Sequence, residues 1–228
     1  MLTFGIIDDG VGIFPTYYKL RQVVNGNFIC LIQSGGLPFN KLNSQQLYRV
    51  GKQAVDVLEG FGCDVIALSS VCLSSVYRRL SHVCATPLYY SDAPILHAAT
   101  YTASNVLVCG DSADCTQTGI PNVIPCVMDE FPSLAEQANE RQIVCYIENC
   151  IQPYYGKFDC IALASSSMNL YKHCFNRACP NARVFDSLDG VARKIRKRFG
   201  KLAREEGTYR VIDQQGVDAT EKYSAFFD

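Results

Sequence analysis

The chain has 228 residues, of which 48% are aliphatic, aromatic or Cys, and a formal net charge of −1. This length allows one large domain or two small ones, and the apolar content excludes a mainly disordered chain. The near-neutral charge gives no overall field that would favour nucleic acid or an anionic membrane, and no apolar run approaches the roughly 18 residues of a membrane helix.

Twelve cysteines are scattered along the chain, several of them inside apolar runs (Cys30, Cys109, Cys145, Cys160). Cysteines in such runs usually behave as small buried hydrophobic residues. The first residues already look like the start of a strand, with no charged segment and apolar segment before them that would form a signal peptide. The sequence therefore predicts a reduced, cytoplasmic protein.

The first predicted element is a strand at residues 4–7, followed by the turn residues Asp8, Asp9 and Gly10. An Asp at the carboxyl end of a buried first strand would lie at the edge where open α/β sheets bind ligands. The alternative is that Asp8 and Asp9 only form a turn and a helix cap. Residues 10–12 lack the third glycine of a dinucleotide-binding motif, which argues against a nucleotide site.

A second strand is predicted at residues 28–32, followed by a loop at 33–41 and a helix capped by Asn43. Apolar residues recur along this helix at the spacing that buries one face on a sheet, up to Gly60 or Gly62. They are Leu47, Val50, Ala54, Val55 and Leu58. Strand, helix and following strand form a βαβ unit, whose crossover is almost always right-handed.

Two stretches of the chain, residues 64–73 and 159–168, are near copies of each other. Each has an Asp, an unbroken apolar run and then a cluster of small, mostly hydroxyl-bearing residues. The pattern fits a strand buried on both faces of a parallel sheet with a turn at its carboxyl end. The copies are about 95 residues apart, which suits two fused half-domains better than a short repeat. The alternative is that buried strands look alike because all are rich in Val, Ile, Ala and Leu.

The second half follows a similar plan. Residues 105–112 repeat the opening strand and its polar end, a helix follows Pro132, and an amphipathic pattern continues through residues 146–151. Residues 191–201 are the one strong charge run, with an apolar stripe at helical spacing. We interpret this run as the solvated face of a packed helix; the alternative is a surface for an acidic partner or anionic lipid.

Four segments, at residues 4–12, 37–41, 184–187 and 209–213, resemble motifs of the cofactor-independent aspartate/glutamate racemase superfamily, and of glutamate racemase in particular. The opening segment is similar to the first strand of that family and its Asp-Ser-Gly-Val-Gly-Gly run. The second resembles its Pro-Tyr-Gly loop, and the third its late Ile-Asp-Ser element. The last, with the helical run 219–227, resembles the family's final strand and helix.

The resemblance implies an α/β protein of two similar subdomains with mainly parallel sheets, related by a pseudo-twofold axis, with the site in the cleft between them. The first half would comprise residues 1–95 plus 188–228, and the second residues 96–187. The expected ligand is a small carboxylic or amino acid. Neither a cofactor such as pyridoxal phosphate nor a metal is expected, and a homodimer is left open.

In the family, two cysteine thiols, one per half, remove and return the α-proton from opposite faces of the substrate. A thiol can be tuned towards neutral pH, where an acid–base catalyst works best, whereas a serine hydroxyl needs a dedicated base. Aligning the two copies places Ser70 and Ser165 at the two thiols. The family's Asn, Thr, Thr and His neighbours are replaced by Val71, Cys72, Ser166 and Ser167.

The candidate catalytic residues are therefore Asp8, Ser70, Cys72 and Ser165. Cys72 is a candidate because a strand running that far would place residues 70 and 72 on one side, and relatives that act as decarboxylases are thought to use one thiol. The alternative for Cys72 is a buried structural residue. Candidate substrate-binding residues are Asp9, Pro38, Phe39, Asn40, Val71, Ser112, Ser166 and Ser167.

The resulting hypothesis is a glutamate/aspartate racemase-like protein with an interdomain pocket for a small (amino) dicarboxylic acid, inactive or altered as a racemase, that is, a pseudoenzyme. The alternative is an active, diverged racemase, isomerase or decarboxylase that transfers a proton next to a carboxylate. His82, His97 and His173 fall in no recognisable motif and are interpreted as surface or core residues.

Overall fold

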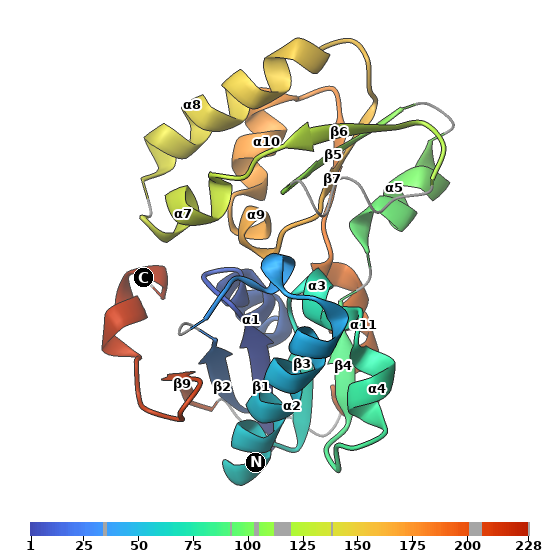
Figure 1. The fold of residues 1–228 in the computed structure, drawn as a ribbon. Coiled ribbons are helices and arrows are strands. Elements are labelled where there is room, and N and C mark those ends of the chain that lie inside the picture. The colour runs from blue at the N-terminus through green and yellow to red at the C-terminus, as the bar shows by residue number, and fades with distance from the viewer. Residues whose placement is uncertain are drawn as a thin grey trace. The chain divides into compact units, whose positions relative to one another are not determined.

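The computed structural model describes residues 1–33, 36–91, 93–102, 105–111, 120–137, 139–200 and 207–227. The chain divides into two compact units, which we call unit 1 (Met1–Ser91 with Leu188–Asp228) and unit 2 (Asp92–Ser187). Each unit is an α/β subdomain built on a parallel sheet (Figure 1), which confirms the predicted fold class. The half-domain boundaries drawn from the sequence, after residues 95 and 187, stay a prediction.

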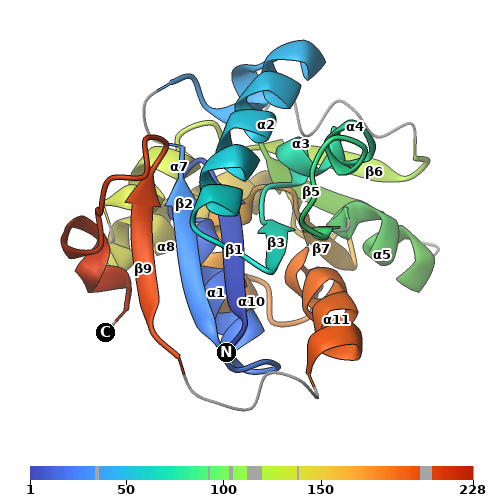
Figure 2. The same cartoon turned by 90° about the horizontal axis from the view of Figure 1, so that it is seen from below.

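The described residues of unit 1 form a sheet of five parallel strands in the order β4-β3-β1-β2-β9. Figure 2 shows β9, β2, β1 and β3 side by side. The strands are β1 (Thr3–Asp8), β2 (Asn27–Ile32), β3 (Val65–Leu68), β4 (Leu88–Tyr90) and β9 (Tyr209–Asp213). Strands β1 to β4 are nearly continuous apolar runs, as expected of strands covered on both faces.

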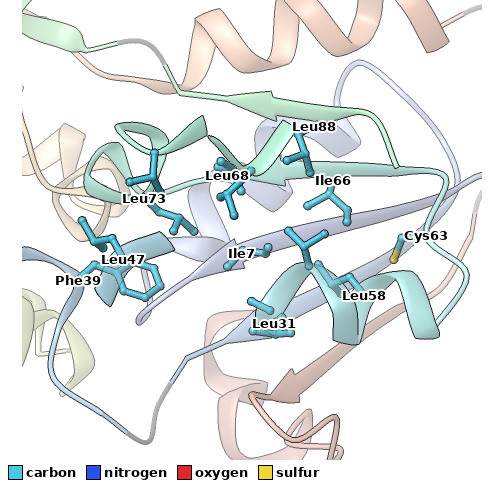
Figure 3. Close-up of a cluster of buried hydrophobic side chains, with 14 of the residues drawn as sticks. Ile7, Leu31, Phe39, Leu47, Leu58, Cys63, Ile66, Leu68, Leu73 and Leu88 are labelled. Atoms are coloured by element: carbon cyan, nitrogen blue, oxygen red, sulfur yellow. The ribbon is translucent and has the colours of Figure 1, made fainter. Parts of the chain in front are cut away.

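Helix α2 (Ser44–Gly60) covers one face of this sheet. It begins where the sequence predicts, because the Asn43 side chain accepts hydrogen bonds from the Gln45 and Gln46 amides and the Gln46 side chain accepts one from the Asn43 amide. Its apolar stripe packs in a buried cluster with residues of β1, β2, β3 and β4 (Figure 3). The cluster includes Ile7, Leu31, Leu58, Ile66 and Leu68.

The remaining elements of unit 1 are α1 (Ile13–Arg21), α3 (Val71–Ser74), α4 (Tyr77–Ser81), α11 (Leu188–Phe199) and the 3-10 turns η1 (Phe39–Lys41) and η3 (Glu221–Phe226). Helix α11 packs on α1 and β4, and it confirms the helix predicted over the charge run. The predicted helical tail is the 3-10 turn η3, where Phe226 stacks on Phe14 with ring centres 4.9 Å apart.

In the part of unit 2 that the structure describes, the sheet has four parallel strands in the order β6-β5-β7-β8. They are β5 (Val106–Gly110), β6 (Val123–Val127), β7 (Cys160–Leu163) and β8 (Arg183–Phe185). The helices among its described residues are α5 (Pro94–Tyr101), α7 (Phe131–Glu136), α8 (Glu140–Ile151), α9 (Ser166–Leu170) and α10 (Lys172–Ala178), with the 3-10 turn η2 (Gln152–Tyr154). Helices α7 and α8 lie where the sequence predicts them.

The two sheets repeat one strand order, because β4-β3-β1-β2 corresponds to β8-β7-β5-β6 and only β9 is additional. The helix after the fourth strand of each repeat belongs to a different unit from that strand, because α5 is part of unit 2 and α11 is part of unit 1. Helix α5 follows β4 but contacts β5, β7 and β8, whereas α11 follows β8 but contacts α1 and β4. Among the described residues, the helices are all too short or too polar to cross a membrane.

Candidate functional site: the polar strand ends of the two sheets

The carboxyl ends of the unit 1 strands bring buried polar side chains to one edge of the sheet, which we call rim 1. Asp8 ends β1, Ser69 and Ser70 follow β3, and Ser91 follows β4. All four are buried, with Asp8 at 0% exposed. This edge of an open parallel sheet is where ligands bind in other α/β proteins.

Asp9, directly after β1, positions a neighbouring loop. Its own amide donates to Asp8 Oδ1 over 2.9 Å, and its carboxylate accepts a hydrogen bond from the Phe39 amide over 2.6 Å. The Phe39 ring is buried in the hydrophobic cluster, while Pro38 is exposed and Asn40 half-buried. Asp9 therefore ties the predicted Pro-Phe-Asn loop to rim 1, with the phenyl ring facing the core.

Ser69 joins β3 to helix α1, a contact that the sequence analysis missed. Its hydroxyl lies 2.6 Å from the Thr16 hydroxyl and donates to the Gly12 carbonyl over 3.1 Å. Ser69 and Thr16 are fully buried, so the hydrogen bonds offset the cost of taking two hydroxyl groups out of water. The pair fixes the glycine-containing turn after β1 against the end of β3.

Ser70 is the N-cap of α3. Its hydroxyl accepts from the Leu73 amide over 3.4 Å, and its carbonyl accepts from the Ser74 hydroxyl over 2.7 Å. Strand β3 ends at Leu68, so the condition under which residues 70 and 72 would lie on one side of a strand is not met. The helix starts at Val71 because the serine cap satisfies a first-turn amide. Cys72 is half-buried and packs against the unit 1 hydrophobic cluster.

The corresponding edge of unit 2, rim 2, is also polar. Asp111 follows β5 and is 5% exposed, Ser187 follows β8, and three serines follow β7. Ser165 is half-buried and its hydroxyl lies 3.0 Å from that of Ser167, while Ser166 and Ser167 are buried. The candidate Ser112 lies outside the described residues. Asp111 is the residue that a fuller comparison with the opening strand would have singled out.

Backbone hydrogen bonds give the correspondence between the two rims. The Ser69 amide donates to Ile7 O over 3.0 Å, and the Ala164 amide donates to Cys109 O over 2.8 Å. Ser70 and Ser165 then occupy the same place in the two repeats, each as the N-cap of a short helix. In the same register Asp111 corresponds to Asp9, and Gly110 to Asp8.

Two further side-chain contacts of unit 2 involve the residues that follow β8. The Asn169 side-chain amide donates to the Ser187 hydroxyl over 3.1 Å, and Lys172 forms an ion pair with Asp186 at 2.6 Å. Asn169 is only 6% exposed, and its Oδ1 has no hydrogen-bond partner within the described ranges. A buried acceptor of this kind is uncommon, and a polar ligand or water would satisfy it.

The three histidines lie away from the strand ends. His82 is the C-cap of α4, His97 lies in α5 and His173 in α10, and all three are exposed. Among the described residues, the carboxylates that directly follow a strand are those of Asp9, Asp111 and Asp186, and those of Asp8 and Asp213 end β1 and β9.

Comparisons with known proteins give the class of the fold. No protein-family model matches the sequence, and no curated protein has a significantly similar sequence. Solved structures do match, and they place the chain in the two-subdomain α/β fold of amino-acid racemases. The fold expected from the resemblance is thereby confirmed.

Within this class, glutamate racemases match over nearly the whole chain. The enzyme from Campylobacter jejuni is 15% identical with a TM-score of 0.76, over 99% of this chain and 96% of that one. The Escherichia coli enzyme, in complex with L-glutamate and the activator UDP-MurNAc-ala, is also 15% identical with a TM-score of 0.76, over 93% and 88%. An aspartate racemase homologue from Pyrococcus horikoshii is 16% identical with a TM-score of 0.51, over 88% and 100%.

Proposed function

We propose that this chain is a racemase-like protein that binds a small dicarboxylic or amino dicarboxylic acid at its polar rims and does not racemise it by the two-thiol route. The observation that carries this proposal is the equivalence of Ser70 and Ser165 in the two repeats. Motif alignment expects the two thiols of the family at these positions, and both are serines.

The hydrogen bonds of the two serines argue against proton transfer by their hydroxyls. A serine hydroxyl becomes a useful nucleophile or base only when a neighbouring group takes its proton. Ser70 accepts from a peptide N–H, which takes no proton, and Ser165 lies against the hydroxyl of Ser167, which is no base near neutral pH. The neighbouring family positions for Asn and His hold Val71 and Ser167.

Binding of a polar ligand is supported by the groups that remain at the rims. Hydroxyls of Ser165 and Ser167 and the first amides of α9 can donate to a carboxylate, and the buried Oδ1 of Asn169 can accept from an ammonium group. Glutamate, the ligand in the Escherichia coli structure, carries both kinds of group. The ligand class is proposed on this chemistry.

A second candidate is an active, diverged enzyme that moves a proton next to a carboxylate. The observation in its favour is Asp8, a carboxylate that is fully buried at the end of β1. Desolvated carboxylates are used as general bases. Cys72, two residues after Ser70, is the other candidate for the group that moves the proton. In this case Asp8 or Cys72 would act in place of the missing thiols.

One experiment separates the two candidates. The protein is incubated in deuterated water with L- or D-glutamate and L- or D-aspartate, the α-proton is followed by NMR, and melting is measured with the same acids. We expect no exchange, and a rise in melting temperature with glutamate or aspartate but not with lysine, because a ligand that binds only the folded state stabilises it.

Variants identify the site. Asn169→Leu removes the buried acceptor and should abolish the ligand-induced rise, whereas Ser133→Ala on the exposed side of α7 should leave it unchanged. Exchange that disappears in Asp8→Asn or Cys72→Ala would establish the second candidate instead. Absence of both exchange and stabilisation would contradict the proposed binding function.

A further inference from the structure

Helices α8 and α10 of unit 2 pack against each other and bring three unlike side chains together. Glu140 is the first residue of α8, whose N-cap Asn139 accepts from the Gln142 amide over 3.3 Å. His173 and Cys174 are the second and third residues of α10. Asn139 therefore fixes the start of the helix that presents the Glu140 carboxylate to α10.

The donor atoms of these three side chains lie close together. His173 Nε2 is 3.3 Å from Glu140 Oε1 and 3.2 Å from Cys174 Sγ, and the sulfur is 4.0 Å from the same carboxylate oxygen. Cys174 is fully buried, while the Glu140 and His173 side chains are 55% and 59% exposed. The trio is thus buried on its sulfur side and open to solvent on the other.

These separations match those within one coordination sphere. Zinc binds Cys sulfur at about 2.3 Å and His nitrogen or carboxylate oxygen at about 2.0–2.2 Å, so the donors of a tetrahedral site lie roughly 3.3–3.6 Å apart. The observed separations of 3.2, 3.3 and 4.0 Å fall around this range. Shifts of a few tenths of an ångström in the exposed side chains would complete the geometry.

We propose that Glu140, His173 and Cys174 form a Zn²⁺ site with three protein ligands and an open fourth position for water. Sulfur and imidazole ligands select zinc over Mg²⁺ or Ca²⁺, which prefer oxygen. On binding, the Cys174 thiol loses its proton to solvent, and the thiolate and the Glu140 carboxylate together balance the two positive charges of the ion.

An ordinary Glu–His ion pair is the simpler interpretation of this cluster. Such a pair on the surface contributes little to stability and does not require a third partner. Here the imidazole nitrogen that faces Glu140 Oε1 also faces the buried sulfur, so one point in space is within reach of three ligand atoms of different kinds. This convergence favours a metal site.

A bound ion would clamp α8 to α10. Helix α10 directly follows Tyr171 at the end of α9, the helix that carries the serines of rim 2. Tyr171 already donates from its hydroxyl to the Ala135 carbonyl over 3.1 Å. The ion would therefore link α10 to α8, in addition to the hydrogen bond that links Tyr171 to Ala135 of α7.

Cobalt reports such a site directly. The metal-free full-length protein is titrated with Co²⁺ alone and followed by absorption spectroscopy. We expect one equivalent to give the intense visible bands of a four-coordinate ion together with a sulfur-to-cobalt charge-transfer band, and Zn²⁺ to abolish both. Bands typical of six-coordinate cobalt, without sulfur charge transfer, would overturn the proposal.

Variants assign the bands to this cluster. Cys174→Ser should remove the charge-transfer band, and the exposed changes Glu140→Gln and His173→Asn should weaken Zn²⁺ binding by more than about 100-fold, the upper end of the effect of outer-shell changes. The controls are Cys145→Ser, an exposed thiol of α8, and His97→Asn in α5. Equal losses in the controls, or none in Glu140→Gln and His173→Asn, would show that the metal binds other thiols. These two exposed variants decide the question even if Cys174→Ser fails to fold.

Discussion

Rim 1 and rim 2 occupy equivalent places in two sheets of the same strand order, yet their serines make different hydrogen bonds. Ser70 caps a helix amide, whereas Ser165 is bonded to a neighbouring serine and caps nothing through its side chain. At the ends of the first strands, Asp8 in unit 1 corresponds to Gly110 in unit 2. The repeated framework therefore fixes where helices start, while the side chains at those starts differ between the halves.

The same register reveals a difference in packing at the centre of the two sheets. Gly5 of β1 corresponds to Leu107 of β5. A Cβ atom at Gly5 would lie 2.8 Å from Leu58 Cδ1 and 3.2 Å from both Cys63 Sγ and Ile66 Cγ1, so α2 can lie close to the strand only because residue 5 has no side chain. In unit 2 the corresponding residue, Leu107, has a fully buried side chain.

The largest expected effect on stability is that of Gly5→Ala, which places a Cβ atom where α2 lies close to β1. Because three neighbours must move, we expect the free energy of unfolding to fall by about 1–3 kcal/mol. Denaturation in urea, monitored by circular dichroism, measures this change. The matched control is Gly60→Ala at the end of α2, where a Cβ would meet nothing within 4 Å and the free energy should change by less than about 0.5 kcal/mol. Equal effects in the two variants would contradict the close approach of α2.

The paired variants Ser70→Ala and Ser165→Ala sharpen the comparison of the rims. Loss of the Ser70 cap should cost about 0.5–1 kcal/mol, the lower half of the usual range because its hydrogen bond is long at 3.4 Å. Ser165→Ala removes no cap and should cost less. Thermal and urea unfolding of the two variants give the difference. A larger loss for Ser165→Ala would show that the serine cluster of rim 2, and not the cap of rim 1, is the stronger stabiliser.

The last prediction concerns reactivity and not stability, at Cys84, a half-buried thiol of unit 1. Burial, and secondly the nearby Glu59 carboxylate, raise the pKa of Cys84 to about 11. Since only the thiolate reacts with iodoacetamide, labelling at pH 8 should be on the order of 100-fold slower than for a free thiol and should increase up to about pH 11. Mass spectrometry of the labelled protein at several pH values measures this rate.

Glu59→Gln tests the second cause of the shift. The glutamine retains an oxygen that can accept from the Ala85 and Thr86 amides, as Glu59 does over 2.9 Å. Loss of the negative charge should lower the pKa of Cys84 and speed its labelling at pH 8, without changing that of Cys150 in unit 2. An unchanged rate at Cys84 would show that burial alone sets its reactivity.

Much of the fold could be predicted from the sequence, because the signals were local. Asn43 and the apolar stripe after it define α2, and the two near copies at residues 64–73 and 159–168 contain β3 and β7. What the sequence did not reveal depends on contacts over long separations. The Thr16–Ser69 and Asn169–Ser187 pairs, and the meeting of Glu140 with His173, join residues whose spacing carries no motif. The end of β3 at Leu68 agrees with the turn predicted at the serines after the apolar run, whereas the short helix α3 that starts at Val71 was not predicted.

Helices α5 and α11 each follow a strand of one unit and belong to the other unit. This arrangement affects the order in which the two units can be completed during synthesis. Unit 2 is one continuous segment, whereas unit 1 lacks α11 and the edge strand β9 until residues 188–213 have been synthesised. Domains generally fold as units during synthesis. Unit 2 can therefore be complete on the ribosome before the last elements of unit 1 have been synthesised, and during that time β2 would be an uncovered edge strand, which is a site for wrong pairing.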